Sequence, residues 1–465
     1  MTRARHVAVI DIGKTNAKLA LVDLDGPGEV SVVTTPNRVL AGPPYPHTDL
    51  DGLWDFITAS LARMQRDFAV DAISVTTHGA SAVLLDDAGA PAVPMPDYEY
   101  DGPDRLAAAY DAIRPDFAET GSPRLPLGLN LGAQLFWLLE TRPDLRERVA
   151  HIVTYPQFWV GRLTGEYCTE GTSLGCHTDL WQPYTGQFSP LVGRLGLAEK
   201  MAPVRRANDP IGTLLPQVAA STGLAADTPV FCGIHDSNAS LYPHLLAQEP
   251  PFSVLSTGTW VIAMAIGGVE TALDPGRDTL INVNAFGDPV PSARFMGGRE
   301  FGLLTRGAYA TPTQRDIDTV LGRAIRLLPA VVAESGPFPG RQARWSVPPE
   351  SLTAGQHGAA VSLYLAMMAE TCLGMIGARG PVLTEGPFAG NPLFLDMLGA
   401  ATGRPVLLPG GSATGTSIGA ALLARGDTPD AIAPAVPHPP PGPERRAHLV
   451  RYAALWRASL ANERD

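Results

Sequence analysis

The feature that most restricts the fold is a strand–turn–strand pattern that occurs twice in this 465-residue chain. Residues 7–26 read VAVIDIGKTNAKLALVDLDG, in which two apolar runs flank the turn Gly13-Lys14-Thr15-Asn16. Residues 250–268 repeat the pattern, with a strand at 252–255, the turn Ser256-Thr257-Gly258-Thr259 and a return strand at 260–266. Apolar runs joined by short glycine turns predict hairpins, and the recurrence of the pattern indicates a duplicated unit.

Each of these turns is suited to hold an anion. The backbone amides of a tight glycine turn, together with the side chains of Thr15 and Asn16, form a concave seat for a phosphate. Asp11 stands just before the first turn, where a carboxylate can hold hydrated Mg²⁺, and Lys14 and Lys18 add positive charge. Short glycine motifs often match by chance, so an ordinary hairpin remains the alternative.

A candidate catalytic base lies between the two hairpins, in residues 229–240, which read PVFCGIHDSNAS. The apolar run 229–232 predicts a short buried strand, and the residues after Asp236 can open a helix. A carboxylate at such a junction is well placed to accept a proton from a bound hydroxyl, with His235 beside it. The alternative is that Asp236 caps the helix and His235 is a satisfied turn residue.

Three polar segments are candidates for contacts with a small molecule. Residues 76–81 form a loop with His78 and Gly79 that follows a strand at 71–75, where ligands gather in α/β sheets. Residues 94–103, PMPDYEYDGP, carry Asp97 and Glu99 and read either as a solvated loop or as a rim that binds a polyol. Residues 169–179 read as a loop rich in glycine and threonine that carries His177 and Thr178.

The remaining elements are expected from periodicity and turn residues. Helices are predicted at 50–70, 130–140, 155–163, 362–376, 393–402, 416–424 and 447–461, strands at 382–384 and 404–408, and a local hairpin that starts at 82–85. Gly297 and Gly298 precede a helical stretch and either contact a phosphate or turn the chain. The glycine-rich loop 385–392 would let a flat base approach the backbone, and residues 431–443 form an extended, proline-rich connector.

Composition excludes several classes of protein. The net charge is −11 and no block of Lys or Arg is present, which argues against a nucleic-acid partner. The four cysteines form no CxxC pair, which indicates a reducing compartment. The apolar run near the N-terminus breaks at Asp11, too early for a signal sequence, and no membrane span is expected. The sequence therefore predicts a soluble, cytoplasmic α/β protein.

Taken together, these motifs resemble the FGGY family of carbohydrate kinases over essentially the whole chain. DIGKTNAK resembles the family's first phosphate motif, STGTW the second, GIHDSNAS the segment of the catalytic base, and EGPFAGNPL…TGRPV the adenosine motif. The resemblance implies an α/β fold of two ribonuclease-H-like (actin/hexokinase-type) domains around a central cleft. It places the N-terminal domain at 1–245, the C-terminal, ATP-binding domain at 246–440, and a docking helix at the end of the connector in 441–465.

The resemblance also implies an activity, which is ATP-dependent phosphorylation of a sugar hydroxyl with Mg²⁺, most similar to rhamnulokinase- and fuculokinase-like members. Asp236 would be the general base and Asp11 the metal ligand. The implied nucleotide contacts are Gly13, Lys14, Thr15, Asn16, Thr257, Gly258, Thr259, Gly298, Gly386, Gly390 and Asn391. The implied sugar contacts, assigned by position, are His78, Gly79, Asp97, Glu99, His177, His235 and Asp236.

The chain departs from the family pattern in ways that leave the sugar open. Lys14 stands where many members carry Thr, and Glu385-Gly386-Pro387 stands where members usually have three glycines. The Trp-x-Asp-x-Arg sugar motif is not recognisable, and residues 94–103 occupy its place. The predicted substrate is a ketose, such as a pentulose or a 6-deoxyhexulose like rhamnulose or fuculose. The alternatives are a polyol or tetrulose kinase and a non-enzymatic nucleotide switch on the same fold, and a homodimer is an open possibility.

Overall fold

The computed structural model describes residues 4–26, 28–306, 309–411, 415–425 and 432–461. The chain divides into two compact units. Unit 1 comprises Met1–Ala247, Ile281–Pro289 and Gly411–Ala433, and unit 2 comprises Gln248–Leu280, Val290–Gly410 and Pro434–Asp465. The division after Ala247 lies near the predicted boundary at 245/246, but two later segments return to unit 1 and the C-terminal helix belongs to unit 2. The continuous domains expected from the sequence, with a separate 441–465 segment, therefore need correction.

The main sheet of unit 1 is built around the first hairpin. Its order is β13 (Pro210–Thr213), β14 (Pro229–Phe231), β6 (Ala72–Thr77), β1 (His6–Ile12), β2 (Asn16–Asp23) and β3 (Gly28–Pro36), and β15 (Ile234–His235) also pairs with β6. β1 and β2 are antiparallel, with Ile12 opposite Ala17, and β1 and β6 are parallel, with Val7 opposite Ala72. β6 is buried along its whole length, as expected of a strand covered on both faces.

The main sheet of unit 2 repeats this order around the second hairpin. It runs β18 (Thr279–Val283), β19 (Pro289–Phe295), β17 (Val261–Ile266), β16 (Phe252–Thr257), β22 (Val382–Glu385), β23 (Val406–Leu408) and β24 (Val436–Pro437). β16 is antiparallel to β17 and parallel to β22, as β1 is to β2 and β6. β17 is in turn antiparallel to β19, as β2 is to β3. The shared order supports the duplication that the sequence predicts.

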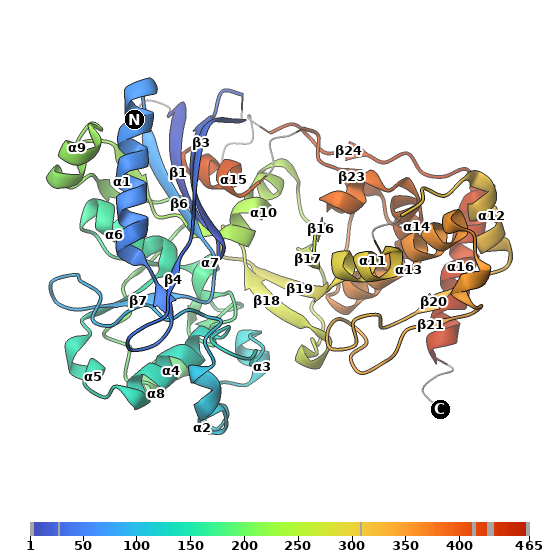
Figure 1. Ribbon diagram of the computed structural model, residues 1–465, viewed down its shortest axis with the longest axis horizontal. Coiled ribbons are helices and arrows are strands. Elements are labelled where there is room, and N and C mark those ends of the chain that lie inside the picture. Colours follow the sequence, from blue (N-terminus) through green and yellow to red (C-terminus); the bar gives the residue numbers. More distant parts are fainter. Residues whose placement is uncertain (1–3, 27, 307–308, 412–414, 426–431, 462–465) are drawn as a thin grey trace. The chain divides into compact units, whose positions relative to one another are not determined.

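In unit 1, helices pack on both faces of the sheet (Figure 1). α1 (Leu50–Asp67) turns Leu53, Ile57 and Leu61 into a core that also contains Ala8 and Ile10 of β1. α10 (Asp236–Ala247) and α15 (Thr416–Leu422) pack against each other, and α15 contacts β1 and β6. The other helices of this unit are α2 (Ala107–Asp111), α3 (Phe117–Thr120), α4 (Leu131–Thr141), α5 (Leu145–Arg148), α6 (Tyr155–Thr164), α7 (Gly171–Leu174), α8 (Pro190–Arg194) and α9 (Pro216–Thr222), with short 3₁₀ turns at Gly102–Leu106 and Leu423–Arg425.

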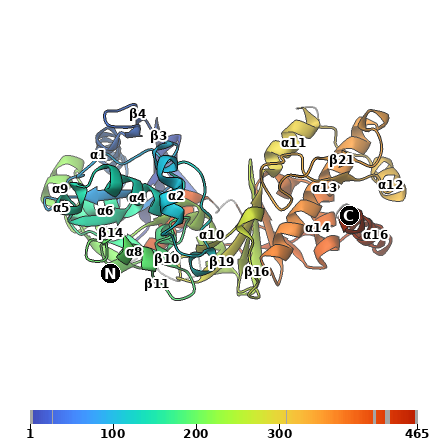
Figure 2. The same cartoon turned by 90° about the horizontal axis from the view of Figure 1, so that it is seen from below.

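In unit 2, a long buried helix forms the centre of the core. α13 (Ala354–Met375) packs against α14 (Pro392–Thr402), and α16 (Pro443–Ala461) packs against α14 (Figure 2). α13 alone among the described helices is long and apolar enough to cross a membrane, but 78% of its most apolar window is buried within the protein, as a core helix would be. The remaining helices of unit 2 are α11 (Gly297–Thr305) and α12 (Gln314–Gly322), with 3₁₀ turns at Pro275–Arg277, Pro349–Ser351 and Pro387–Gly390.

Most predicted elements are present, and two expectations need correction. β7 (Ala82–Leu85) enters a local turn with a Leu85–Pro91 bridge, but its strand partner is the distant β8 (His151–Thr154). The 169–179 segment is not only loop, because it contains β9 (Thr169–Glu170) and α7. Both β7 and β9 pair with strands that lie far away in the sequence. The short strands that complete unit 1 are β4 (Val39–Leu40), β5 (His47–Thr48), β10 (Trp181–Gln182), β11 (Gln187–Phe188) and β12 (Val204–Arg205), and unit 2 has β20 (Leu327–Leu328) and β21 (Arg344–Trp345).

Candidate active site

Asp236 stands at the start of α10, directly after β15, which confirms the predicted strand–helix junction. Its Oδ1 accepts a 2.6 Å hydrogen bond from the backbone N–H of Ser237 and lies 3.3 Å from His235 Nε2. The Asp236 side chain is 32% exposed, whereas His235 is buried. The carboxylate therefore contacts the first turn of the helix, as a capping residue does, and is also open enough to meet a ligand.

Gly79 is required to be glycine by the ring of His235. A Cβ atom at Gly79 would lie 2.6 Å from His235 Nε2 and 3.4 Å from Cys176 Sγ. The first distance is far below van der Waals contact. Because Gly79 has no side chain, the loop after β6 can pack directly against the ring of His235, and any larger residue at position 79 would clash with that ring.

His78, the neighbour of Gly79, is buried and has a defined tautomer. Its Nδ1 lies 3.0 Å from the carbonyl oxygen of Gly79, and a carbonyl only accepts, so Nδ1 carries the proton and donates. Burial lowers the pKa of His78, against the hydrogen bond to Gly79 and the charge of Asp236, and Lys14 and His235 add to the lowering. The neutral ring, packed edge to face against Tyr98 at 5.1 Å between centroids, keeps Nε2 as an acceptor.

The first hairpin turn is linked to the 94–103 segment. Lys14 Nζ contacts Asp97 Oδ1, lies 3.4 Å from Glu99 Oε2, and sits 4.7 Å from the centre of the Tyr98 ring. The sequence suggests that Lys14 adds charge at the phosphate, but here its charge is shared with two carboxylates. Thr15 and Asn16 are exposed at the tip of the turn, which is closed by a 2.9 Å bond from Gly13 N–H to the Asn16 carbonyl.

Asp11 is a partly enclosed carboxylate beside this turn. Its Oδ2 accepts a 3.0 Å hydrogen bond from the Ser417 hydroxyl and lies 3.4 Å from Lys18 Nζ. Burial raises the pKa of Asp11, Lys18 and Ser417 oppose the rise, and the negative charge of Asp236 adds to it. A buried carboxylate with this environment gains from a nearby cation, and Mg²⁺ is usually held by one or two carboxylates together with phosphates and water. The donor set therefore fits a hydrated Mg²⁺.

The described residues hold no group of three or more His, Cys, Asp or Glu side chains that could by itself bind a metal ion. A metal ion at Asp11 would therefore take further ligands from phosphates or water.

The loop that carries His177 places further polar groups around His235. Cys176 Sγ lies 3.4 Å from His177 Nε2 and 3.7 Å from His235 Nε2. The hydroxyl of Thr172 accepts from the backbone N–H of His235 at 3.0 Å and donates to Glu170 Oε2 at 2.5 Å. Burial raises the pKa of Glu170 to about 7, against the hydrogen bonds that it accepts from Thr172 and Ser173.

In unit 2, the second hairpin turn is also closed by a glycine N–H, but over a shorter span than the first. Gly258 N–H donates to the Trp260 carbonyl at 2.9 Å. Gly298, at the start of α11, packs so closely that a Cβ there would lie 2.2 Å from the Gly258 carbonyl oxygen. The sequence places Gly298 before a helix, whereas the helix already begins at Gly297. The N-terminus of α11 therefore lies against the turn.

The glycine-rich loop is tied to the second hairpin by Thr257. The Thr257 hydroxyl donates to the Glu385 carbonyl at 2.5 Å and accepts from the backbone N–H of Phe388 at 3.1 Å. Gly386 has φ of +80°, and a Cβ at this position would lie 1.9 Å from the Thr257 carbonyl oxygen. Both the backbone conformation and the lack of space therefore demand glycine here.

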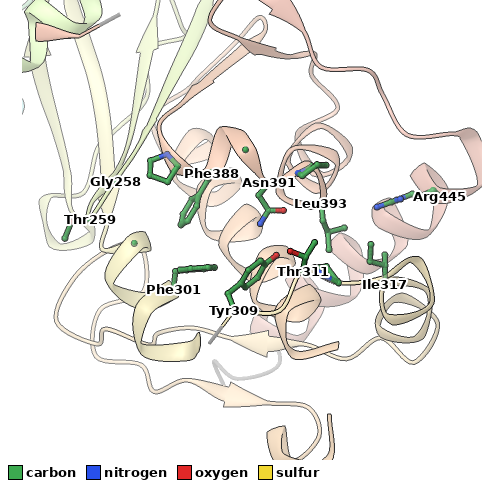
Figure 3. Close-up of a pocket in the computed structure, with 15 residues that line it drawn as sticks. Gly258, Thr259, Phe301, Tyr309, Thr311, Ile317, Phe388, Asn391, Leu393 and Arg445 are labelled. Carbon is green, nitrogen blue, oxygen red and sulfur yellow. The ribbon is translucent and has the colours of Figure 1, made fainter. Parts of the chain in front are cut away.

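These segments enclose a cavity of about 600 Å³ in unit 2. Gly258, Thr259, Gly298, Gly390 and Asn391 line it, so it gathers five of the residues predicted to contact the nucleotide. The rings of Phe301, Tyr309 and Phe388 also face the cavity (Figure 3). Phe301 lies 5.1 Å from Tyr309 and 5.8 Å from Phe388 between ring centres. A cavity of this size with aromatic walls suits a flat, drug-sized ligand.

Asn391 lines the cavity and also caps a helix. Its Oδ1 caps α14 by accepting from Phe394 N–H at 3.2 Å, and its Nδ2 donates to Ser362 Oγ at 2.9 Å. Thr257 and Gly386 do not line the cavity; they hold the loop that does.

Sequence reasoning missed several residues that contact the predicted ones. Cys176 was passed over because it belongs to no cysteine motif, and Ser417 because a serine in a helix of small residues carries no local signal. Glu170 stands two residues before Thr172 and resembles any loop acid. Phe301 lies in the helix that begins at Gly297, but nothing in the pattern marks its ring as a cavity wall, and Tyr309 comes from a segment without a glycine motif.

Both halves of the chain match models of known protein domains. Residues 113–242 match the N-terminal domain model of the FGGY family of carbohydrate kinases, and residues 249–433 match the model described as carbohydrate kinase FGGY, C-terminal domain. The chain is similar to an L-fuculokinase of Salmonella typhi, with 30% identity over 280 residues. It is also similar to a probable L-xylulose kinase of Pasteurella multocida, with 27% identity over 284 residues. These matches cover 57% of this chain and 58% and 56%, respectively, of the relatives' length.

Solved structures resemble the whole chain. A carbohydrate kinase from Novosphingobium aromaticivorans is 36% identical, with a TM-score of 0.91 and full coverage of both chains. A ligand-bound xylulose kinase from Lactobacillus acidophilus shares the fold at 15% identity, with a TM-score of 0.78 and 98% of both chains covered. The two domain models match in the expected order and the likeness extends over the full length, so the chain belongs to the FGGY family of carbohydrate kinases.

Proposed function

We propose that this protein transfers the γ-phosphoryl group of ATP to a hydroxyl group of a sugar, with Asp236 as the general base. The observation that carries the proposal is the Asp236 carboxylate, which is partly exposed at the start of α10 among otherwise buried polar groups. Its Oδ1 is fixed by Ser237 and lies against His235. A carboxylate held in this way is oriented toward a ligand before the ligand arrives.

The reaction is a phosphoryl transfer in which Asp236 takes one proton. As the sugar oxygen bonds to the γ-phosphorus, the bond to the β–γ bridging oxygen breaks and ADP leaves, while the hydroxyl proton passes to Asp236. Lys18 lies near Asp11 and adds positive charge beside the first turn. When bound, Mg²⁺ would supply charge neutralisation of the phosphates, and Asp11 is the residue that would hold it.

The proposed sugar contacts lie around Asp236 in unit 1. The neutral His78 offers Nε2 as an acceptor for a sugar hydroxyl, and Gly79 leaves room for the ring of His235. His177 Nδ1 and His235 Nδ1 are buried without a hydrogen-bond partner among the described residues, and such atoms favour a polar ligand. Asp97 and Glu99, held by Lys14, complete the proposed rim.

The proposed nucleotide contacts lie in two places. In unit 2, the cavity with Phe301, Tyr309 and Phe388 would take the adenine ring, because the two faces of a flat base stack on aromatic walls. In unit 2, the turn Thr257–Thr259, Gly298 and the 386–391 loop would contact the ribose and phosphates. In unit 1, the turn Gly13–Asn16 is the proposed contact for a phosphate.

We propose a ketose as the substrate, of the pentulose or 6-deoxyhexulose class. The support is the naming of the relatives as L-fuculokinase and L-xylulose kinase, whereas the residues of the rim do not select one sugar by themselves. All four cysteines are free and buried, in keeping with action in the reducing cytoplasm, where ATP is made.

An ADP-release assay tests the proposal across tetruloses, pentuloses, 6-deoxyhexuloses and polyols. At least one ketose should release ADP with Mg²⁺ present. Asp236→Asn should then lower kcat by at least about 10²-fold, the scale of general-base loss, while calorimetry shows unchanged ATP binding. ATP turnover without any dependence on added sugar would instead support a nucleotide switch.

A further inference from the structure

Cys176 occupies a position that no step of the proposed reaction uses. Its sulfur is buried between two imidazole rings, 3.4 Å from His177 Nε2 and 3.7 Å from His235 Nε2. A Cβ at Gly79 would reach both Cys176 and His235, so the thiol lies against the same glycine as the histidine. A thiol between two imidazoles is the arrangement that favours loss of the thiol proton to a ring.

His235 connects this thiol to the proposed base. Nε2 lies 3.7 Å from Cys176 Sγ and 3.3 Å from Asp236 Oδ1, so the same ring nitrogen faces both groups. The other nitrogen, Nδ1, is buried and has no hydrogen-bond partner among the described residues. The backbone N–H of His235 is held by Thr172. The orientation of the ring therefore depends on what surrounds Nε2, and Cys176 is one of the two side chains there.

The charges around the ring support an ion pair. Burial opposes ionisation of Cys176, but His177 and His235 outweigh it and lower the pKa of the thiol to about 5. Burial likewise opposes a charge on His235, but Cys176, and then Asp236 and Glu170, raise its pKa to about 9. Other titratable groups also interact with this cluster. His78, directly after β6, interacts with His235 and Asp236 and is itself influenced by Lys14 of the first turn. Asp11 and Tyr98 interact with Asp236.

We propose that Cys176 is a positioning residue, present as a thiolate between His177 and His235, which holds the His235 ring in place beside Asp236. The proton leaves Cys176 Sγ for the imidazole of His235, so the pair becomes thiolate and imidazolium with no net change in charge. The imidazolium then donates from Nε2 toward Asp236 and the thiolate. This inference rests on the proposed role of Asp236, but the ionisation of Cys176 can be measured without any kinase reaction.

The direct test is the ultraviolet absorbance of the thiolate near 240 nm, followed from pH 4 to pH 9 in the full-length protein. The wild-type protein should show a step with a midpoint near pH 5. Cys176→Ser should remove the step, because a serine hydroxyl does not ionise in this range. Cys372→Ser is the matched control: Cys372 is a buried thiol in α13 of unit 2 whose pKa is raised by burial, so this variant should keep the step.

A kinetic measurement tests whether the thiolate affects Asp236. With a ketose that the wild-type protein phosphorylates, Cys176→Ser should lower kcat about 10-fold, the effect of a small misplacement of a reacting group, and leave KM for ATP unchanged. Loss of the thiolate also removes the strongest influence that keeps His235 charged, so the basic limb of the pH–rate profile should move to lower pH. Cys372→Ser should leave both the rate and the profile as in the wild type.

Two results would overturn the inference. A difference spectrum between wild type and Cys176→Ser with its midpoint at pH 8 or above would mean that Cys176 is a neutral thiol. A Cys176→Ser protein that folds, lacks the step and keeps the wild-type pH profile would mean that the thiolate does not act on Asp236. If no sugar is phosphorylated but the step near pH 5 is present, the proposed function fails while the assignment of the thiolate stands.

Discussion

At the scale of single residues, the candidate site depends on a glycine, Gly79, whose missing side chain leaves space for a neighbouring ring. Gly79 has no positive φ to explain it; it is glycine because the ring of His235 occupies the space of a Cβ atom. The same ring touches Cys176 and Asp236, so a methyl group at position 79 acts on the proposed base indirectly.

We therefore expect Gly79→Ala to displace the His235 ring and to lower kcat by about 10- to 100-fold, the cost of misplacing a catalytic group by about 1 Å. Steady-state kinetics with ATP and a ketose substrate measure this. Gly193→Ala is the matched control, because Gly193 lies in α8 with no atom near an added Cβ; it should keep the wild-type rate. Equal rates in Gly79→Ala and wild type would show that the ring has room to move.

Glu170 gives a prediction for stability against pH. Burial raises its pKa to about 7, from an ordinary value of 4.5. The folded protein therefore binds this proton more tightly than the unfolded chain, so the contribution to stability is complete below about pH 4.5 and is lost as pH rises through 7. A shift of this size corresponds to about 3 kcal/mol.

The measurement is urea unfolding of wild type and Glu170→Gln at pH 5, 6, 7 and 8. The wild-type free energy of unfolding should fall relative to that of the variant as pH rises through this range. Two parallel curves would mean that the Glu170 carboxyl is not held protonated near neutrality.

At the scale of elements, the sequence predicted the two hairpins, the strand–helix junction at Asp236 and the long helices. Each of these depends on local patterns: apolar runs, glycine turns and helical spacing. It did not predict the pairing of β7 with β8, or the contacts of Ser417 with Asp11 and of Cys176 with His235. Those depend on segments that are 59 to 406 residues apart in the chain, for which no local pattern exists.

Asn391 and Asp236 illustrate a further limit at this scale. Asn391 caps a helix and Asp236 stands at the start of one, which is a purely structural role. Each residue also faces a candidate ligand site. One sequence pattern is compatible with both tasks, so the pattern alone does not separate them.

Thr257 joins two elements, and its removal should loosen the second hairpin from the glycine-rich loop. Thr257→Val deletes a hydroxyl that donates a hydrogen bond to the Glu385 carbonyl and accepts one from the Phe388 N–H. We expect a loss of about 1–3 kcal/mol in stability, the cost of unsatisfied buried groups, and weaker ATP binding. Thermal unfolding and calorimetry measure the two effects. Thr257→Ser keeps the hydroxyl and should restore most of both; equal losses in Ser and Val would point to packing of the methyl group instead.

At the scale of the whole molecule, the two sheets repeat one order of strands, with an antiparallel hairpin and a parallel neighbour in each. The two copies carry different side chains. In unit 1 the first turn lies beside carboxylates, and in unit 2 the second turn lies beside an aromatic cavity. We therefore expect the two units to contribute different contacts, with the proposed sugar contacts in unit 1 and the proposed adenine cavity in unit 2.

Hydrogen exchange of the full-length protein should separate these two ligands. A non-hydrolysable ATP analogue should slow exchange in 298–301 and 387–393, which line the cavity of unit 2, by up to about 100-fold at 100 times its Kd. A ketose substrate alone should slow exchange in 76–81 and 234–240 of unit 1, because the proposed contacts lie on these segments. Asp236→Asn should keep the nucleotide pattern, since Asp236 does not line the cavity. A sugar that protects the cavity segments of unit 2 and leaves 234–240 unchanged would contradict the assignment of the sugar to unit 1, and Asp236 would then lose its proposed substrate.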